Sequence, residues 1–143
     1  MNDLTETELA VIRRLVGRII PASTEYGVPG ADDDVIFSDI TATLAPNIAA
    51  LGDMLASLEA DAVERASAPD IDALIQRLQE PFGPAVGLLI AVVAQCYYRD
   101  DRVMRSLEME ARAPFPKGFE VEAGDWSLLD PVRARSPIWR DAT

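Results

Sequence analysis

Eighteen consecutive residues without a charge, Pro81 to Tyr98 (PFGPAVGLLIAVVAQCYY), constrain the fold of this chain more than any other feature. The chain as a whole is 26% charged, yet twelve of the fifteen residues from 84 to 98 are apolar, with no single apolar stripe. A helix that is apolar all round must be surrounded by lipid or by other protein elements. The run is shorter than the about 20 residues that span a bilayer. We therefore predict a buried apolar helix over about 84–98, at the centre of a soluble bundle.

Hydrophobic periodicity and turn residues predict the helices that cover this segment. The first begins at the capping-box pattern Thr5-Glu6-Thr7-Glu8 and ends at Pro21, and the second follows the acidic run Asp32-Asp33-Asp34. The sequence thus predicts an all-α fold, a small orthogonal bundle, with helices over about 5–20, 34–45, 46–64, 71–80, 84–98 and 102–110.

The pattern changes at residue 113, after which Pro and Gly residues recur too often for long helices. We predict a helical bundle over 1–112 and an extended, aromatic and Pro-rich tail over 113–143. The tail holds Phe115, Phe119, Trp126 and Trp139, an aromatic content that fits poorly with disorder. Trp and Arg are enriched at the anchors of protein interfaces. The tail therefore docks either on its own bundle or on a partner, and both alternatives stay open.

The composition excludes several classes of function. The chain has no His and one Cys, which excludes Ser–His and Cys–His catalytic pairs, His-bound zinc and an intramolecular disulfide. Its net charge of −11 disfavours binding to nucleic acid and to anionic lipid. The carboxylates lie mainly on predicted solvent-facing positions. We therefore predict no catalytic residue, no cofactor or metal site, no direct membrane insertion, and a binding role instead of an enzymatic one.

The beginning of the sequence bears on localisation. The stretch MNDLTETELA is acidic and polar, the reverse of the basic start of a secretory signal. Arg13-Arg14 is followed by too short an apolar run for a twin-arginine export signal. We predict a cytoplasmic protein, periplasmic only if it is exported together with a partner or if a signal has been removed.

Two stretches resemble the gluconate 2-dehydrogenase subunit 3 family. Residues 8–40, ELAVIRRLVGRIIPASTEYGVPGADDDVIFSDI, contain a helix that ends in Ile-Ile-Pro, a loop that ends in Pro-Gly-Ala, and a second helix. Residues 97–120, YYRDDRVMRSLEMEARAPFPKGFE, resemble the closing pattern of the family. Together the two stretches cover about 40% of the chain. Two features depart from the family pattern: acidic residues follow Ala31, and Glu108 stands where a glycine is expected.

The resemblance implies a small helical accessory subunit of a large FAD-dependent dehydrogenase of the glucose–methanol–choline type, with the FAD in the large subunit. Such a subunit binds and stabilises its partner, in the manner of a chaperone. The contacts would come from the loop over 21–31, the end of the apolar helix and the tail: Ile20, Pro21, Tyr26, Pro29, Tyr97, Tyr98, Phe115, Phe119, Trp126 and Trp139. An alternative of another class is a stand-alone helical module that binds a small apolar ligand in a cavity lined by Leu88, Val92 and Ile48. A small enzyme of a further type is the third alternative.

Overall fold

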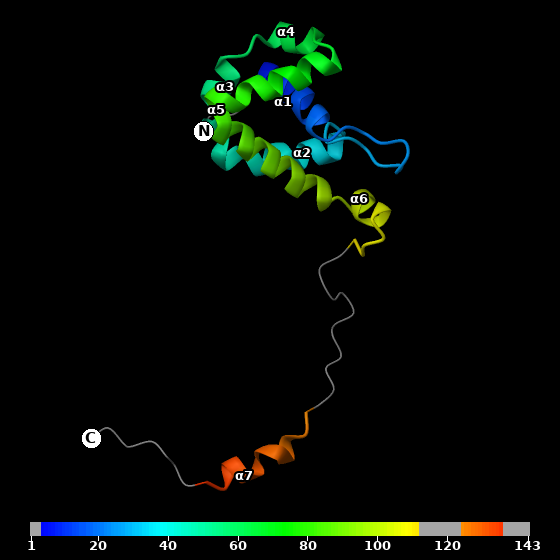
Figure 1. Cartoon of the computed structure of the whole chain (residues 1–143), viewed down its shortest axis with the longest axis vertical. Coiled ribbons are helices and arrows are strands. Elements are labelled where there is room, and N and C mark those ends of the chain that lie inside the picture. Colours follow the sequence, from blue (N-terminus) through cyan, green and yellow to red (C-terminus); the bar gives the residue numbers. More distant parts are fainter. Residues whose placement is uncertain (1–3, 112–123, 136–143) are drawn as a thin grey trace, which may run out of the picture. The chain divides into compact units, whose positions relative to one another are not determined.

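The computed structural model describes residues 4–111 and 124–135 of the chain. The chain divides into two compact units, Met1–Arg112 and Ala113–Thr143 (Figure 1).

The described part of the first unit is helical. Its elements follow in the order α1 (Glu6–Ile19), α2 (Asp34–Leu44), the 3-10 helix η1 (Ala45–Leu51), α3 (Gly52–Ala56), α4 (Ala60–Arg65), α5 (Ala68–Tyr98) and α6 (Asp101–Ser106). The only β-type pairing among the described residues is one bridge between Ser23 and Val28. The predicted all-α fold is therefore confirmed for the residues that the structure describes.

Side-chain caps set where the main helices begin. Thr5 and Glu8 form the predicted capping box at the start of α1. Ser67 and Asp70 form a second one at the start of α5, which the sequence analysis missed. Asp33 accepts hydrogen bonds from the first amides of α2, so the acidic run serves as a cap. These caps satisfy amide groups that have no partner within the helix.

The single third helix predicted over 46–64 is wrong. The chain forms η1, α3 and α4 in its place, with a break between Ala56 and Ala60. No side chain caps η1, α3 or α4. At the break, the Ser57 hydroxyl donates to the Met54 carbonyl at 2.7 Å, a local bond that competes with helix propagation. Leu51, Met54 and Leu55 face inward, whereas Ala62, which the same spacing placed on the inner side, is exposed. The periodicity therefore indicated the buried side of η1 and α3 but not the breaks.

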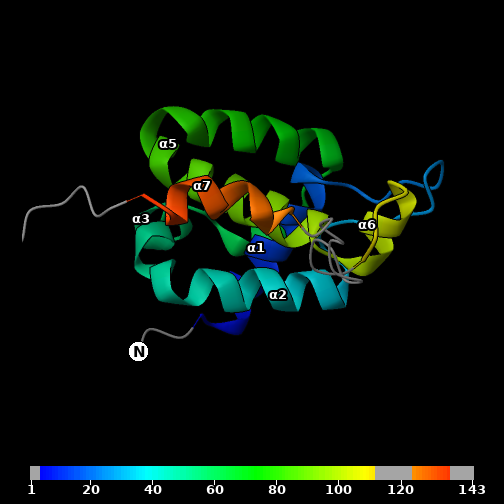
Figure 2. The same cartoon turned by 90° about the horizontal axis from the view of Figure 1, so that it is seen from below.

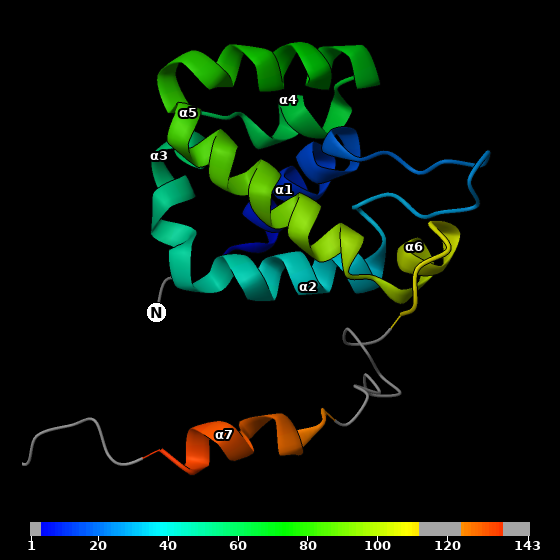
Figure 3. The ribbon, with the colours of Figure 1, turned by 60° about the horizontal axis from the view of Figure 1, so that its bottom comes forward.

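Helix α5 has two halves that meet at Phe82, whose backbone (φ −129°, ψ 32°) is not helical. Pro81 and Pro84 flank this point, and a proline inside a helix lacks an N–H and crowds the preceding turn. The predicted boundary between a fourth helix and the apolar helix thus appears as a kink within one element. Figure 3 shows the second half crossing from the level of α4, over α1, to α2.

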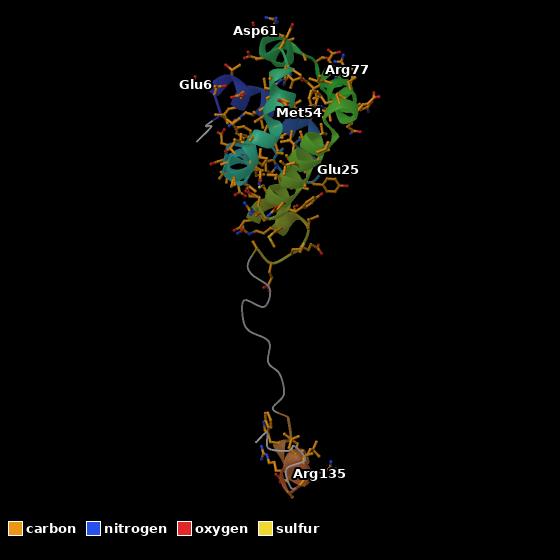
Figure 4. All side chains as sticks on the ribbon, turned by 90° about the vertical axis from the view of Figure 1, so that its left-hand side faces the viewer. Glu6, Glu25, Met54, Asp61, Arg77 and Arg135 are labelled. Carbon is orange, nitrogen blue, oxygen red and sulfur yellow. The ribbon has the colours of Figure 1, made fainter. Side chains whose placement is uncertain are left out.

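The core lies where α5 packs against α1 and α2. Figures 2 and 3 both show α1 between the first half of α5, at the top, and α2, at the bottom. Its fully buried side chains include Ile12, Ile40, Leu44 and Val93. Figure 4 shows Met54 inside the bundle, where it is also fully buried. No polar or charged residue is buried in the described part of the chain, so burial of apolar side chains is the main force that holds this interior together.

Two stretches are long and apolar enough to cross a membrane when judged by length and composition alone, residues 34–56 and helix α5. Core helices of water-soluble bundles meet the same criteria, and both stretches contribute residues to the core here. The first stretch is also not one straight helix, because it comprises α2, η1 and α3.

The expectation that residues 84–98 are buried on all sides is wrong. One half of this helix packs into the core, while Pro84, Gly87, Ile90, Ala91 and Tyr98 are exposed. A helix that is apolar on every side needs other elements around all of it. The described part of this chain covers only one half of residues 84–98.

The described part of the second unit is helical as well. Residues Trp126–Leu129 form the 3-10 helix η2, and Asp130–Arg133 form α7. Asp125 caps the first of these through the Ser127 amide, at 3.0 Å. Pro131 lies in the first turn of α7, where its missing N–H has no cost. An extended conformation is therefore wrong for residues 126–133.

Candidate partner-binding surface

The exposed half of α5 between residues 84 and 98 is the main candidate for a binding surface. At about 100° per residue, the buried side chains of this half fall on one side of the helix and the exposed ones on the other. We name the exposed side the open face of α5. It consists of Pro84, Gly87, Ile90, Ala91, Gln95 and Tyr98, with the half-buried Leu88 and Ala94.

The open face carries no charge, and Gln95 and the Tyr98 hydroxyl are its only polar side-chain groups. Ile90 is 38% exposed and Tyr98 is 56% exposed. Gly87 contributes no side chain to this face, and a Cβ built there would project into open space, with nothing within 4 Å. In a water-soluble bundle the solvent-facing side of a helix is ordinarily charged or polar. A continuous uncharged face of this kind is typical of a surface that another molecule covers.

Tyr97 and Ile20 hold the predicted contact loop in place. Tyr97 is 5% exposed, and its hydroxyl donates to the Pro29 carbonyl at 3.1 Å. Ile20 is half-buried against the core, and its carbonyl accepts from the Ala31 amide at 2.9 Å. Burial raises the pKa of the Tyr97 hydroxyl, so this group stays a hydrogen-bond donor at neutral pH. The Tyr97 side chain and the Ile20 backbone therefore bind their own loop, and neither residue is an exposed candidate for contact with a partner.

The Pro29-Gly30-Ala31 motif closes the loop onto α1. Ala31 is fully buried, and Gly30 lies so close to its neighbours that an added Cβ would stand 2.4 Å from an oxygen of Asp32 and 2.9 Å from the Ala22 nitrogen. A Cβ on Gly17, in α1, would stand 2.9 Å from the Asp32 carboxyl carbon. Both glycines thus make room for one side chain, Asp32, which packs the end of the loop against α1.

The remaining predicted contacts divide into exposed residues and residues outside the described part. Pro21 is exposed and Pro29 is half-buried, while Tyr26 is 69% exposed at the tip of the loop, next to Gly27 with φ +62°. In the second unit Trp126 is 68% exposed. Phe115, Phe119 and Trp139 lie outside the described residues. The exposed set, with Tyr98, remains available for contact with a partner.

Sequence analysis missed a groove of about 810 Å³ between α2, the end of α5 and the start of α6. Ile36 and Cys96 form its apolar floor, and Arg99 and Arg102 line it together with three aspartates. Arg99 binds the Asp39 carboxylate with two hydrogen bonds, one of them at 2.6 Å. The Arg and Asp residues at 99–102 are the sequence signal that could have indicated this groove. Their partners at the start of α2 and within it lie 60 to 69 residues earlier in the chain, so the sequence does not show which residues pair.

Arginine side chains hold several carboxylates in and beside this groove in ion pairs. Hydrogen bonds from Arg99 lower the pKa of Asp39, and hydrogen bonds from Arg102 lower the pKa of Asp33 and Asp100. Burial raises the pKa of the Cys96 thiol, which keeps it protonated and a poor nucleophile. Within the described residues no group of three possible metal ligands lies together.

A second, smaller groove of about 250 Å³ lies between α1 and α4. Glu6, Asp61 and Glu64 border it, and Val11 is among its apolar residues. Figure 4 shows Glu6 and Asp61 at the same end of the bundle. Among the described residues no basic side chain lines this groove, so its border is acidic.

Comparisons with known proteins leave the surface to be interpreted on its own geometry. No family model, no curated protein and no solved structure matches this chain.

Proposed function

We propose that this chain is a non-catalytic subunit that binds and stabilises a larger FAD-dependent dehydrogenase acting on sugars or alcohols. The open face of α5 is the observation that carries the proposal. The identity of the partner comes from the resemblance of residues 8–40 and 97–120 to small subunits of such enzymes. In this proposal the FAD and the catalytic residues belong to the partner, and the complex is cytoplasmic.

The physical support comes from what the bundle leaves uncovered. Half of an apolar helix faces outward, and large uncharged patches on water-soluble proteins mark binding sites. An acidic chain with net charge −11 is repelled by anionic lipid surfaces. A protein partner is therefore favoured over a bilayer as the cover for this face. Tyr26, on the loop, and Trp126, in the second unit, add exposed aromatic anchors of the type that dominates interface energetics.

The alternative, a stand-alone module for a small apolar ligand, gains no support from the grooves described above. Leu88, Val92 and Ile48 line neither the groove between α2 and α5 nor the groove between α1 and α4. Val92 is buried among core side chains, whereas Leu88 lies at the border of the open face. The described geometry favours covering by a large surface over enclosure of a small molecule.

Co-expression with a candidate FAD-dependent dehydrogenase tests the proposal, with two matched lysine variants. Ala91→Lys places a charge in the open face, while Ala62→Lys places one on α4, and both alanines are exposed. A charge buried without a partner at an interface costs several kcal/mol, so Ala91→Lys should lower the affinity at least tenfold. Ala62→Lys should leave the affinity unchanged, and both variants should keep the thermal stability of the wild type.

Trp126→Ala probes the second unit in the same assay and should weaken the complex while the helical circular dichroism signal stays intact. The proposal fails if the wild-type chain purifies alone from such co-expressions, or if Ala91→Lys binds the partner as well as wild type does. Binding of the isolated chain to uncharged lipid vesicles through the same face would replace the protein partner with a membrane.

A further inference from the structure

One guanidinium group holds the starts of two helices together. Arg102 donates to Asp33 at 2.6 and 3.1 Å, and to both oxygens of Asp100 at 3.0 Å. Asp33 is the N-cap of α2 and Asp100 is the N-cap of α6. Both carboxylates accept amide hydrogens of their own helices at the same time. The beginning of α6 is therefore tied to the beginning of α2, 69 residues earlier in the chain.

Few other contacts hold α6 to the bundle. Val103 is its one fully buried side chain, whereas the Arg105–Asp101 ion pair lies within α6 itself and binds it to nothing else. Leu107 and Met109, which follow it, are more than half exposed. Short elements with so few buried apolar contacts open locally at a much lower free energy than the whole fold.

The place of α6 gives this opening a consequence. The residues at its start, Asp100, Asp101 and Arg102, form one wall of the groove between α2 and α5. The floor of that groove contains Ile36 and Cys96, which are both 1% exposed. Movement of α6 away from α2 would widen the groove and uncover the apolar side chains on which Val103 packs.

We propose that α6 is a strap that opens while the rest of the bundle stays folded, and that the Arg102–Asp33 clamp sets how often it opens. Among the described residues, the clamp is the one hydrogen-bonded ion pair that joins a charged side chain of α6 to the start of α2. The strap controls access to the groove, whichever partner covers the open face of α5, so this inference does not depend on the proposed function.

Hydrogen exchange followed by mass spectrometry on the full chain tests the strap. The informative amides are those of Met104, Leu107 and Met109, which donate to carbonyls within or just before α6 at 2.9 to 3.2 Å. Arg102→Ala should speed their exchange about tenfold, because it removes the charge-assisted hydrogen bonds to Asp33 as well as those to the Asp100 cap. Amides in the middle of α1 should exchange as slowly as in wild type.

Two further variants separate the clamp from other effects. Asp33→Asn removes the charge but keeps a good cap for α2, since Asn is as effective as Asp at the N-cap. It should speed exchange in α6 in the same way. Arg105→Ala removes only the pair within α6 and should change exchange there less than twofold.

Three results would overturn the strap. In the first, α6 amides are unprotected in the wild type. In the second, they exchange at the wild-type rate in both Arg102→Ala and Asp33→Asn. In the third, they exchange at the rate of the α1 amides in every variant, which means that α6 opens only when the whole fold does. If Arg102→Ala unfolds the chain altogether, α1 exchange rises too, and Asp33→Asn then decides.

Discussion

Gly17 and Gly30 both lie close to the Asp32 side chain. We therefore predict that the effect of Gly17→Ala on the free energy of unfolding changes sign when Asp32 is replaced by Gly. Gly17→Ala adds a Cβ to the interior of α1, where the only atoms closer than about 3.1 Å belong to the Asp32 side chain. In the wild type the added methyl group therefore meets Asp32. Asp32→Gly removes the three atoms nearest to the added Cβ, so the same Gly17→Ala change should then be free of this close contact.

The magnitude follows from two opposing terms. Ala in place of Gly in a helix interior stabilises by about 0.8–1.0 kcal/mol. Overpacking at a distance of 2.9 Å costs about 1–3 kcal/mol. We expect Gly17→Ala to be neutral or destabilising by up to about 2 kcal/mol in the wild type. In the Asp32→Gly background it should stabilise by about 1 kcal/mol, a coupling of about 1–3 kcal/mol between the two sites.

Urea unfolding of the four chains of this double-mutant cycle measures the coupling, and the cost of the new glycine at position 32 cancels within the cycle. Gly87→Ala is the matched control, because Gly87 lies in the α5 helix with nothing within 4 Å of its added Cβ. It should stabilise by about 1 kcal/mol in both backgrounds. A coupling below about 0.5 kcal/mol for Gly17 and Asp32 would refute the close approach, as would destabilisation by Gly17→Ala in the Asp32→Gly chain.

Three further predictions concern stability. Tyr97→Phe removes the hydrogen bond to the Pro29 carbonyl and should lower the free energy of unfolding by about 1 kcal/mol in urea titrations, whereas an unchanged value would show that the bond does not form. Ile40→Ala empties a fully buried site and should cost about 2–5 kcal/mol, against less than about 1.5 kcal/mol for Ile90→Ala on the open face; equal thermal shifts would mean that Ile90 is covered. The pKa values of Asp33, Asp39 and Asp100 are lowered by their arginine partners, so the stability they contribute is complete above the unfolded pKa of about 4 and is lost as pH falls through the lowered folded values. Arg99→Ala and Arg102→Ala should flatten this acid limb in thermal scans, and an unaltered limb would contradict the pairing.

Sequence reasoning predicted the helical class because its signals are local. The capping box at Thr5 and the periodic apolar positions of α1 depend only on residues within a few turns of each other. The prolines at 81 and 84 likewise marked the kink at Phe82. The break between Ala56 and Ala60 was missed because apolar residues continue on either side of it and no Pro or Gly stands at residues 57–59. Pro46, by contrast, marked the boundary after Leu44.

The site could be predicted only in part, since exposure is a property of the assembled bundle. Residues 84–98 are apolar on every side, so their sequence does not tell which half the other helices cover. Tyr97 and Tyr98 show this clearly, because one is buried and the other exposed although they are neighbours of the same type. Arg102 and Asp33 are 69 residues apart in the sequence, so no local sequence pattern predicts their pairing.

The open face of α5 is about 22 Å long, the rise of fifteen helical residues. Because this face is apolar, we expect self-association of the chain to depend on its concentration. Under the proposed function, a copy produced in excess of its partner has no partner surface to cover the open face of α5. Contact with the open face of a second copy would then remove this apolar area from water. Dilution should then separate such copies, while high concentration should bring them together. Under the proposed function, production of the two subunits in equal amounts would keep this protein dispersed.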